Sequence, residues 1–367
     1  MYKLISTILI AFTFSGTFAQ RLSREEKKII SAIEDNKEAS IQLLEQIVNI
    51  NSGTMNLEGV KEVGMVLKEE FENIGMTTQW IDMASVERSG HLFAETIGKK
   101  GKRILLIGHL DTVFPKTEAF QKMERKENGI VYGPGANDMK GGDIIMLYAL
   151  KALYEVNLLE KAQIIVALTG DEELTGKPLS VSRKDLIDAG KRSDIALGFE
   201  TSTGFDNVTL ARRGSSGWKV EIEGKRAHSS GIFSEDVGAG AIFEAGRILN
   251  DFYEEISGEE YLTFNPGVMV GGTIANYDEP MNLGDAFGKT NVVAQKAVID
   301  GDLRFISEEQ KENTRQKMRA IVTRNLPQTS AKITFFDSYP SMAPTLGNEA
   351  LMEKFSKVSL DLGQGPV

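Results

Sequence analysis

The chain has 367 residues, a formal net charge of −10, 41% hydrophobic and 26% charged residues, and no cysteine. This composition is typical of a globular protein, and the length predicts two domains. The negative charge argues against nucleic acid or an anionic membrane surface as a partner, and the lack of cysteine excludes disulfides, thiolate catalysis and cysteine-ligated zinc. Any histidine-dependent chemistry must use one of only three histidines, His91, His109 and His228.

Residues 1–19 have the pattern of a cleaved export signal. Lys3 supplies a positive charge, residues 4–14 are mostly apolar, and small residues precede a cut after Ala19. The apolar run is shorter than the ~20 residues that a membrane span needs, and no cysteine follows it that could carry a lipid. We therefore expect an exported protein, periplasmic or secreted, without a membrane anchor in the mature chain.

The next residues predict two helices and two strands. Apolar residues recur at helical spacing through residues 23–50, and again from Leu57 to Ile74. Residues 77–81 and 91–97 are expected to be strands. His91 is interpreted as a partly exposed residue at the start of a strand rather than as a ligand.

Residues 104–107 are four consecutive large apolar residues, which predict a strand buried on both faces. The strand leads into Gly108 and then His109 and Asp111, whose side chains face the same side if the strand continues. The carboxyl end of a buried strand is where open α/β sheets place their ligand sites. A histidine there can bind a metal through one ring nitrogen while a carboxylate orients the ring through the other. The alternative is a histidine in a polar turn.

Two more apolar strands also end in acids. Residues 163–168 are followed by Glu172 and Glu173, and residues 195–199 are followed by Glu200. One such ending is easily structural, whereas three at one edge of a sheet would place several carboxylates together. Each cluster could still be an acidic, solvated turn, but that interpretation does not explain why each cluster follows a buried strand.

Between these strands, the glycine-rich residues 129–142 contain Asp138 as their only acid, and a helix is expected from Asp143 to Val156. Carboxylates this close cannot all ionise unless they are paired, and no basic cluster accompanies them. One histidine with several carboxylates suits zinc or another divalent metal in a paired site that activates water. Glu172 and Glu173 are adjacent and point different ways, so we expect one to bind metal and the other to accept a proton from the water.

The motifs GHLDTV, GPGANDMKGG, GDEELTG and GFET, in this order, closely resemble the dizinc metallopeptidases of the M20 family, especially its glutamate carboxypeptidase-like branch. The resemblance covers roughly residues 40–345. It implies an α/β catalytic domain with a mixed, mostly parallel sheet and helices on both faces. It also implies an inserted α+β, ferredoxin-like domain that acts as a lid and usually dimerises.

The resemblance further implies two Zn²⁺ ions, or another divalent metal such as Co²⁺ or Mn²⁺. The roles that it implies are His109 and Glu200 as ligands of one zinc, Asp138 as the bridging ligand, Glu173 as ligand of the other zinc, Glu172 as general base, and Asp111 as the residue that orients His109. It also implies a cis peptide bond between Asp138 and Met139.

The second half of the chain predicts a different module. Strands are expected at 218–223, 268–275 and 297–305, and helices at 237–252 and 308–325. This pattern of two helices on an antiparallel sheet is typical of an α+β domain. The expected boundaries are therefore a signal at 1–19, the first part of the catalytic domain at 20–212, the inserted domain at 213–325 and the second part of the catalytic domain at 326–367.

The resemblance assigns substrate binding to three residues of the inserted module, His228 in AHSS, Asn291 in TNVV and Arg304 in DLRF. Arg304 could hold a carboxylate with two parallel hydrogen bonds, and His228 and Asn291 could donate to a developing oxyanion. The alternatives are a histidine at a strand end, an asparagine in a turn and an arginine on the surface.

The family takes a final histidine ligand from near its C-terminus, after a glycine-rich segment. The sequence ends at Val367 with no histidine beyond His228. We therefore expect a C-terminally truncated sequence that is poorly soluble, binds at most one zinc tightly and is nearly inactive.

The favoured function is dizinc-dependent hydrolysis of a peptide or peptide-like amide bond, with a carboxypeptidase that releases a C-terminal residue such as glutamate as the leading form. An aminopeptidase or N-acyl amino acid deacylase of the same fold is one alternative, and a non-catalytic binding protein that lost its metals is another. The expected partners are a small peptide or N-acyl amino acid and a second copy of the chain, bound through the inserted domain.

Overall fold

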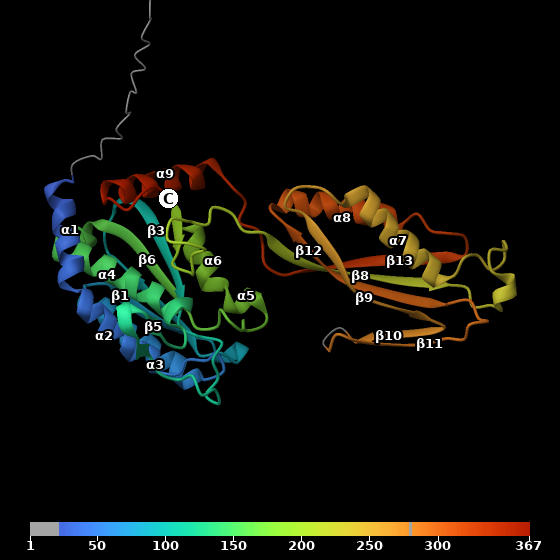
Figure 1. Cartoon of the computed structure of the whole chain (residues 1–367), viewed down its shortest axis with the longest axis horizontal. Coiled ribbons are helices and arrows are strands. Elements are labelled where there is room, and N and C mark those ends of the chain that lie inside the picture. The colour runs from blue at the N-terminus through green and yellow to red at the C-terminus, as the bar shows by residue number, and fades with distance from the viewer. Residues whose placement is uncertain (1–21, 279–280) are drawn as a thin grey trace, which may run out of the picture. The chain divides into compact units, whose positions relative to one another are not determined.

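The computed structural model describes residues 22–278 and 281–367, so the export signal expected at 1–19 lies outside the described residues. The chain divides into two compact units, a first that ends at Phe205 and a second at Asp206–Val367 (Figure 1). Among the described residues, no helix combines the length and apolar character needed to cross a bilayer.

The helices of the first unit are α1 (Arg24–Asp35), α2 (Lys37–Val48), α3 (Leu57–Asn73), α4 (Gly141–Glu155), α5 (Leu179–Ser182) and α6 (Lys184–Lys191). The single helix expected over residues 23–50 is wrong, because α1 and α2 meet at Asn36. The backbone of Asn36 leaves the helical region, and its side-chain amide donates to the Ala32 carbonyl oxygen at 2.8 Å. A polar side chain that bonds to the preceding turn competes with the continuing helix.

The first unit is built on a five-stranded sheet with the order β1-β2-β6-β3-β7. Its strands are β1 (Thr77–Asp82), β2 (Gly90–Glu95), β3 (Lys100–His109), β6 (Ala162–Thr169) and β7 (Ile195–Gly198). β3 is parallel to both β6 and β7, whereas β2 is antiparallel to both of its neighbours. The expectation of a mixed, mostly parallel sheet is confirmed. A short hairpin of β4 (Glu124–Arg125) and β5 (Val131–Tyr132) lies outside it.

Helices cover both faces of this sheet (Figure 1). On one face, α2, α3 and α4 contribute buried side chains such as Phe71 and Leu147, which join a core with Leu106 and Val166 of the strands. On the other face, Ala189 of α6 packs with residues of β2, β3 and β6. Burial on both sides explains why these strands read as continuous apolar runs rather than as alternating patterns.

The register of the parallel strands brings their carboxyl ends to one edge. His109, the last residue of β3, pairs with Thr169, the last residue of β6, and Ile107 pairs with Gly198 at the end of β7. The polar residues that follow β6 and β7 therefore start beside His109.

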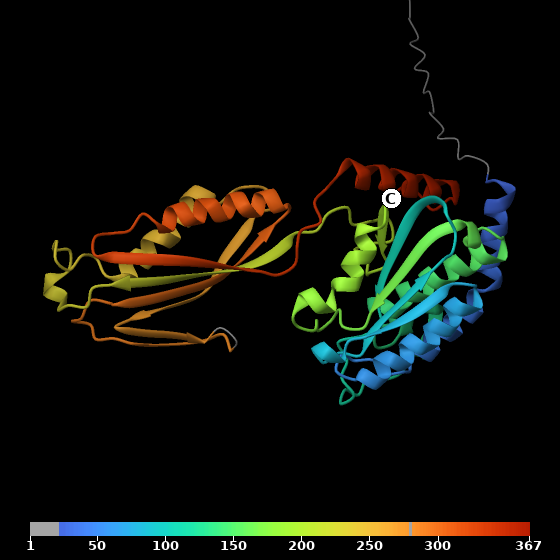
Figure 2. The same cartoon turned by 180° about the vertical axis from the view of Figure 1, so that it is seen from behind.

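The second unit contains β8 (Gly214–Gly224), α7 (Ala241–Ile256), β9 (Thr263–Gly272), β10 (Ile274–Asp278), β11 (Leu283–Phe287), β12 (Lys296–Phe305), α8 (Glu308–Val322), β13 (Thr329–Asp337) and α9 (Leu346–Asp361). Its main sheet is antiparallel with the order β13-β8-β12-β9, and α7 and α8 lie along one face (Figure 2). The buried side chains of Trp218, Phe252 and Ile299 join sheet and helix in one core. This is the expected ferredoxin-like α+β module, although the β10–β11 hairpin was not predicted.

The second unit continues past the boundary expected at residue 325. β13 pairs with β8 from Thr329↔Gly224 to Asp337↔Ser216, so this segment completes the second sheet instead of returning to the first. Ile333 and Phe335 of β13 pack against the core of the second unit. Without β13, β8 would be an edge strand with unpaired backbone groups, which explains why residues 329–337 belong to the second unit.

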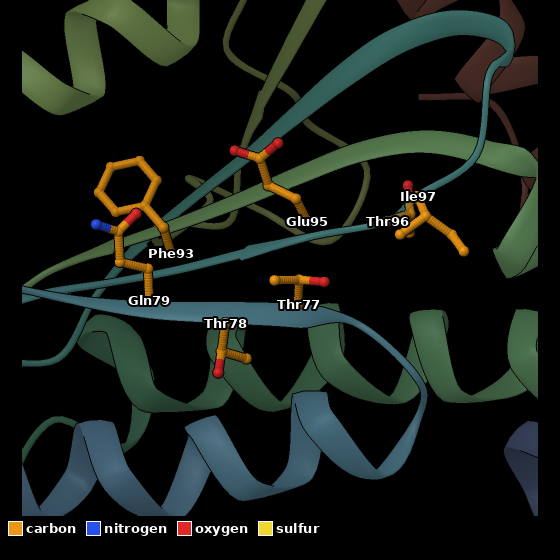
Figure 3. Close-up of a pocket in the computed structure, with 7 residues that line it drawn as sticks. All are labelled: Thr77, Thr78, Gln79, Phe93, Glu95, Thr96 and Ile97. Atoms are coloured by element: carbon orange, nitrogen blue, oxygen red, sulfur yellow. The ribbon is translucent and has the colours of Figure 1, made fainter.

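A cavity of about 240 Å³ lies along β1 and β2 of the first unit (Figure 3). Its lining residues are Thr77, Thr78, Gln79, Phe93, Glu95, Thr96 and Ile97. Thr96 bonds to Ile164 near the start of β6, whereas His109 pairs with Thr169 at its end. This cavity therefore lies away from the edge at which the three strand ends meet.

Candidate metal centre

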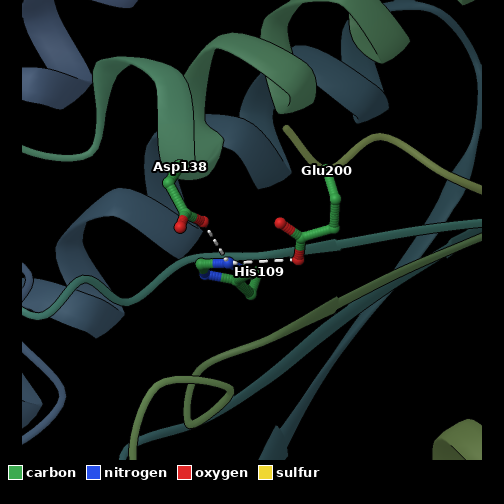
Figure 4. Close-up of side chains that lie close together, drawn as sticks. All are labelled: His109, Asp138 and Glu200. Atoms are coloured by element: carbon green, nitrogen blue, oxygen red, sulfur yellow. Dashed lines mark hydrogen bonds and ion pairs between the residues drawn. The ribbon is translucent and has the colours of Figure 1, made fainter. Parts of the chain in front are cut away.

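His109 is the centre of a group of possible metal ligands. Its side chain is buried, and its Nε2 atom lies 3.2 Å from Asp138 Oδ1 and 3.4 Å from Glu200 Oε1 (Figure 4). One donor atom from each of these residues lies within 4.8 Å of the other two. Three of the four predicted metal ligands are thus brought together.

The other ring nitrogen of His109 fixes the orientation of the ring. Nδ1 lies 3.0 Å from the backbone carbonyl oxygen of Asp111. Since a carbonyl oxygen can only accept, Nδ1 carries a hydrogen and donates it. In the neutral imidazole, the lone pair of Nε2 then faces the two carboxylates, as a metal ligand requires.

The charges around His109 decide whether its ring carries a second proton. Burial lowers the pKa of His109, but the hydrogen bonds and charges of Asp111 and Glu200 outweigh burial and raise it to about 11. The metal-free histidine is therefore protonated at neutral pH, with a cationic N–H between two carboxylates. A divalent cation can replace that proton, so the donor set fits a divalent metal.

Asp138 lies in the glycine-rich loop that precedes α4, and the expected cis peptide bond between Asp138 and Met139 is present. A buried lysine anchors this loop. Lys140 donates to the carbonyl oxygens of Ile47 at 2.9 Å and Ile50 at 3.0 Å, at the end of α2, and burial lowers the pKa of Lys140 to about 7. The Ile47 carbonyl accepts from the Ile50 N–H at 3.3 Å as well, so the lysine joins the turn that ends α2 and fixes the loop to it.

A buried carboxylate lies directly behind His109. Asp143 at the start of α4 is buried, and neither of its side-chain oxygens has a hydrogen-bond partner among the described residues. Burial raises the pKa of Asp143 well above its usual value. A side chain at Gly108 would place its first carbon 2.2 Å from Asp143 Oδ1, so Gly108 makes room for this carboxyl group.

Asp111 orients His109 in a different way from the one expected. Its carboxylate oxygen is 3.5 Å from Nδ1 of His109, farther than its backbone carbonyl. The carboxylate accepts instead from Thr54 Oγ1 at 2.6 Å and from the backbone N–H groups of Glu172 at 3.0 Å and Glu173 at 3.1 Å. Sequence reasoning missed this second function of Asp111, because no local pattern indicates which backbone a buried carboxylate binds.

Glu172 and Glu173 stand side by side in the loop after β6. Burial raises the pKa of Glu172. Burial, followed by the charge of Asp138, raises the pKa of Glu173 to about 7. Among the described residues, Glu173 is not part of the group formed by His109, Asp138 and Glu200. Its role as a ligand of a second metal therefore stays a prediction.

The three predicted substrate-binding residues do not all gather within the second unit. His228 and Asn291 are neighbours, because Ser229 N–H donates to the Asn291 carbonyl oxygen at 2.9 Å and His228 bridges to Val292. Asn291 precedes the start of β12, whereas Arg304 lies near the end of that strand. The distance along the strand from Ala297, near its start, to Arg304 is about 23 Å. Its Nε donates to Asp302 at 2.9 Å, and the side chain is half exposed.

A cavity of about 490 Å³ in the first unit adjoins Glu173. It is formed by the loops that follow α2, β3 and β6, and its lining residues are Gly53, Thr54, Met55, Asn56, Thr112, Val113, Pro115, Lys116, Glu173 and Leu174. Three of these are exposed apolar side chains, Met55, Val113 and Leu174. A concave, largely apolar surface beside a perturbed carboxyl group is typical of a ligand site.

The family model for peptidase family M20/M25/M40 matches residues 105–366 of the chain. Carboxypeptidase G2 of Pseudomonas sp. (strain RS-16) is 26% identical over 352 residues, which cover 95% of this chain and 79% of that protein. A probable succinyl-diaminopimelate desuccinylase of Staphylococcus aureus (strain MSSA476) is 28% identical over 61% of this chain, and the match spans about half, 54%, of that protein's length.

Two solved structures share the fold. The aminopeptidase PepT of Bacillus cereus has a TM-score of 0.68 at 20% identity, with 90% of this chain and 84% of that chain covered. YXEP of Bacillus subtilis, described as a dinuclear metal-binding peptidase of the M20 family, has a TM-score of 0.56 at 13% identity, with 91% and 82% covered.

The raised pKa of His109 predicts proton release on metal binding. Zinc titrated into the metal-stripped protein at neutral pH should displace about one proton from His109, because the neutral imidazole is the ligand. Calorimetric titration in buffers of different ionisation enthalpy measures this number. His109→Asn should abolish both the release and tight binding, and a wild-type binding enthalpy independent of the buffer would contradict the assignment.

Proposed function

The chain belongs to peptidase family M20/M25/M40 and is a metallopeptidase, a hydrolase of peptide or amide bonds, and from this premise we propose that it is a dizinc carboxypeptidase. The observation that carries the proposal is Nε2 of His109, which faces the carboxylates of Asp138 and Glu200. A non-catalytic binding protein that lost its metals is disfavoured, because such a protein has no use for a histidine and two carboxylates gathered in this way.

We propose two Zn²⁺ ions, with Co²⁺ or Mn²⁺ as substitutes. His109 and Glu200 would hold one ion, Glu173 would hold the other, and Asp138 would be a ligand of both. When bound, such ions supply Lewis acidity toward water and a carbonyl group. The dinuclear site described for the Bacillus subtilis neighbour, and the charge of Asp138 acting on Glu173, support the pair.

Glu172 is the proposed general base. Its raised pKa brings the carboxylate closer to the proton affinity that base catalysis near neutral pH requires. The hydrogen bond from its backbone to Asp111 ties it to the strand that carries His109. Glu172 would take a proton from the attacking water and pass it to the leaving amine.

The direction of cleavage is inferred from two observations. Similarity to carboxypeptidase G2 extends over nearly the whole chain, and the guanidinium of Arg304 can hold a free carboxylate with two hydrogen bonds. We therefore propose release of a C-terminal residue such as glutamate, from a small peptide or an N-acyl amino acid. Similarity to a desuccinylase and to an aminopeptidase favours an N-acyl amino acid deacylase or an aminopeptidase as the second candidate.

The cavity beside Glu173 is the proposed binding place for the acyl group. Its volume falls in the usual range of small-molecule sites, and the exposed apolar side chains of Met55, Val113 and Leu174 would be covered by a bulky apolar group.

We also propose export to the periplasm or the exterior, on the pattern of residues 1–19, and a homodimer formed through the second unit. Apolar side chains exposed on α7 and on the β10–β11 hairpin, among them Ile242, Phe243, Ile274 and Phe287, support a contact surface there.

The base is tested by Glu172→Gln in the zinc-loaded protein. The substitution keeps the size of the side chain and removes its basicity, so kcat should fall on the order of 10²–10⁴-fold with little change in KM. Metal content measured by mass spectrometry should stay at the wild-type value. Full activity with a loss of zinc would reverse the roles of Glu172 and Glu173.

The role of Arg304 is tested by Arg304→Ala with peptides whose C-terminus is free or amidated. Loss of a charged hydrogen-bonding partner should raise KM for the free acids roughly 10–100-fold and much less for the amides. Arg213→Ala is the matched control, since that exposed arginine bonds to Thr263 beside Arg304. Equal effects on acids and amides would favour the aminopeptidase or deacylase.

The acyl site is tested by Val113→Trp, which narrows the cavity. The ratio of kcat/KM between a substrate with a bulky aromatic acyl group and its acetyl analogue should fall about tenfold. Ile187→Trp, on the exposed surface of α6, should leave the ratio unchanged. An unchanged ratio in Val113→Trp would remove the cavity from substrate binding.

A further inference from the structure

We propose that Arg183 and Asp171 are positioning residues that place Glu172 for catalysis by fixing the loop of residues 170–176. The inference rests on the proposed role of Glu172 as the base. Neither Arg183 nor Asp171 is assigned to the metal or to the substrate, and both act through the loop.

The guanidinium of Arg183 binds the loop at two places. Nη1 donates to the carboxylate of Asp171, and Nη2 donates to the Asp171 carbonyl oxygen at 3.0 Å and to Thr175 Oγ1 at 3.1 Å. One planar group therefore joins the residue before Glu172 to the residue that follows Leu174. Only arginine offers this fixed fork of donors, because the ammonium of lysine is a single point.

Asp171 closes the loop from within. Its side chain is completely buried, and Oδ2 accepts from Gly176 N–H at 2.9 Å. Ser182, the residue before Arg183, donates from Oγ to the Gly176 carbonyl oxygen at 2.9 Å. The side chains of Asp171 and Ser182 thus bond to both backbone polar groups of Gly176, at the end of the loop.

His91 secures the entry to the loop, and this corrects the expectation of a partly exposed strand residue. The ring is fully buried, Nδ1 accepts from Gly170 N–H at 3.1 Å, and Nε2 donates to the Ser182 carbonyl oxygen at 2.9 Å. The ring links β2, the end of β6 and the segment that carries Arg183. Both ring nitrogens serve this structural link, which leaves neither for metal.

This arrangement matters because the described hydrogen bonds of Glu172 and Glu173 are made by their backbones, both to Asp111. Their carboxylates are therefore placed by the course of the loop. Displacement of a catalytic group by about 1 Å can reduce turnover by about 10²-fold. The ion pair between the buried carboxylate of Asp171 and the mostly buried guanidinium of Arg183 is well suited to prevent such a displacement, since breaking the pair would leave a buried charge without its partner.

A double-mutant cycle separates positioning from general stability. Arg183→Lys, Glu172→Gln and the double variant are compared with wild type as zinc-loaded, full-length proteins. We expect Arg183→Lys to lower kcat about 10–100-fold at nearly constant KM in the wild-type background. In the Glu172→Gln background the same change should alter kcat less than about twofold, because the group that it positions is already inert.

Arg192→Lys is the matched control, since Arg192 pairs with Glu95 through two bonds on the exposed surface. It should leave kcat within about twofold. Melting temperature and zinc content are measured for every variant. If Arg183→Lys does not fold, Asp171→Asn, which keeps the side-chain size but removes the charge, takes its place in the same cycle.

The outcomes distinguish the inference from its premise. Equal fold-losses of kcat in both backgrounds would show that Arg183 does not act through Glu172 and would overturn the inference. A rise in KM with unchanged kcat would overturn it as well. Wild-type activity of Glu172→Gln alone would instead remove the proposed base, whatever Arg183 does.

Discussion

The carboxylate of Asp111 is buried, yet it accepts hydrogen bonds from Thr54 and from the backbones of Glu172 and Glu173, while the carbonyl of the same residue accepts from His109. Burial alone would raise the pKa of Asp111, but the nearby charge of His109 and the hydrogen bond from Thr54 outweigh burial and lower it. One residue therefore couples the metal-ligating ring to the loop that carries the proposed base. Asp171 and Arg183 bond to Gly176 and Thr175 of the same loop, so the positions of the two glutamates depend on two buried carboxylates, those of Asp111 and Asp171.

The centre gathers several carboxyl groups around one histidine. His109 compensates for part of their negative charge by retaining a proton between Asp138 and Glu200, which allows the acids to sit together before any metal arrives. Carboxylates this close repel one another when no metal is bound. The same closeness favours binding of a divalent cation. Binding of a divalent metal and loss of the proton from His109 are therefore coupled.

Sequence reasoning located the strand ends because apolar runs followed by polar residues are local signals, and because parallel strands end at one edge. His109, Asp138 and Glu200 could be predicted on that basis together with the family resemblance. The environment of His91 could not, since its partners Gly170 and Ser182 are distant in sequence and are backbone groups. The boundary at 325 failed for a related reason, because only the pairing partner decides which sheet an amphipathic strand such as β13 joins.

Gly108 carries a consequence for how this site can vary. The space that a side chain would need there is filled by the carboxyl group of Asp143, the end of Met139 and Leu168. Any larger residue would push against groups on α4, β6 and the Asp138 loop at once, directly beneath the metal-ligating ring. Residue 108 can therefore not be replaced by a larger residue unless α4, β6 and the Asp138 loop change together. Residues that line the neighbouring cavity can be substituted one at a time.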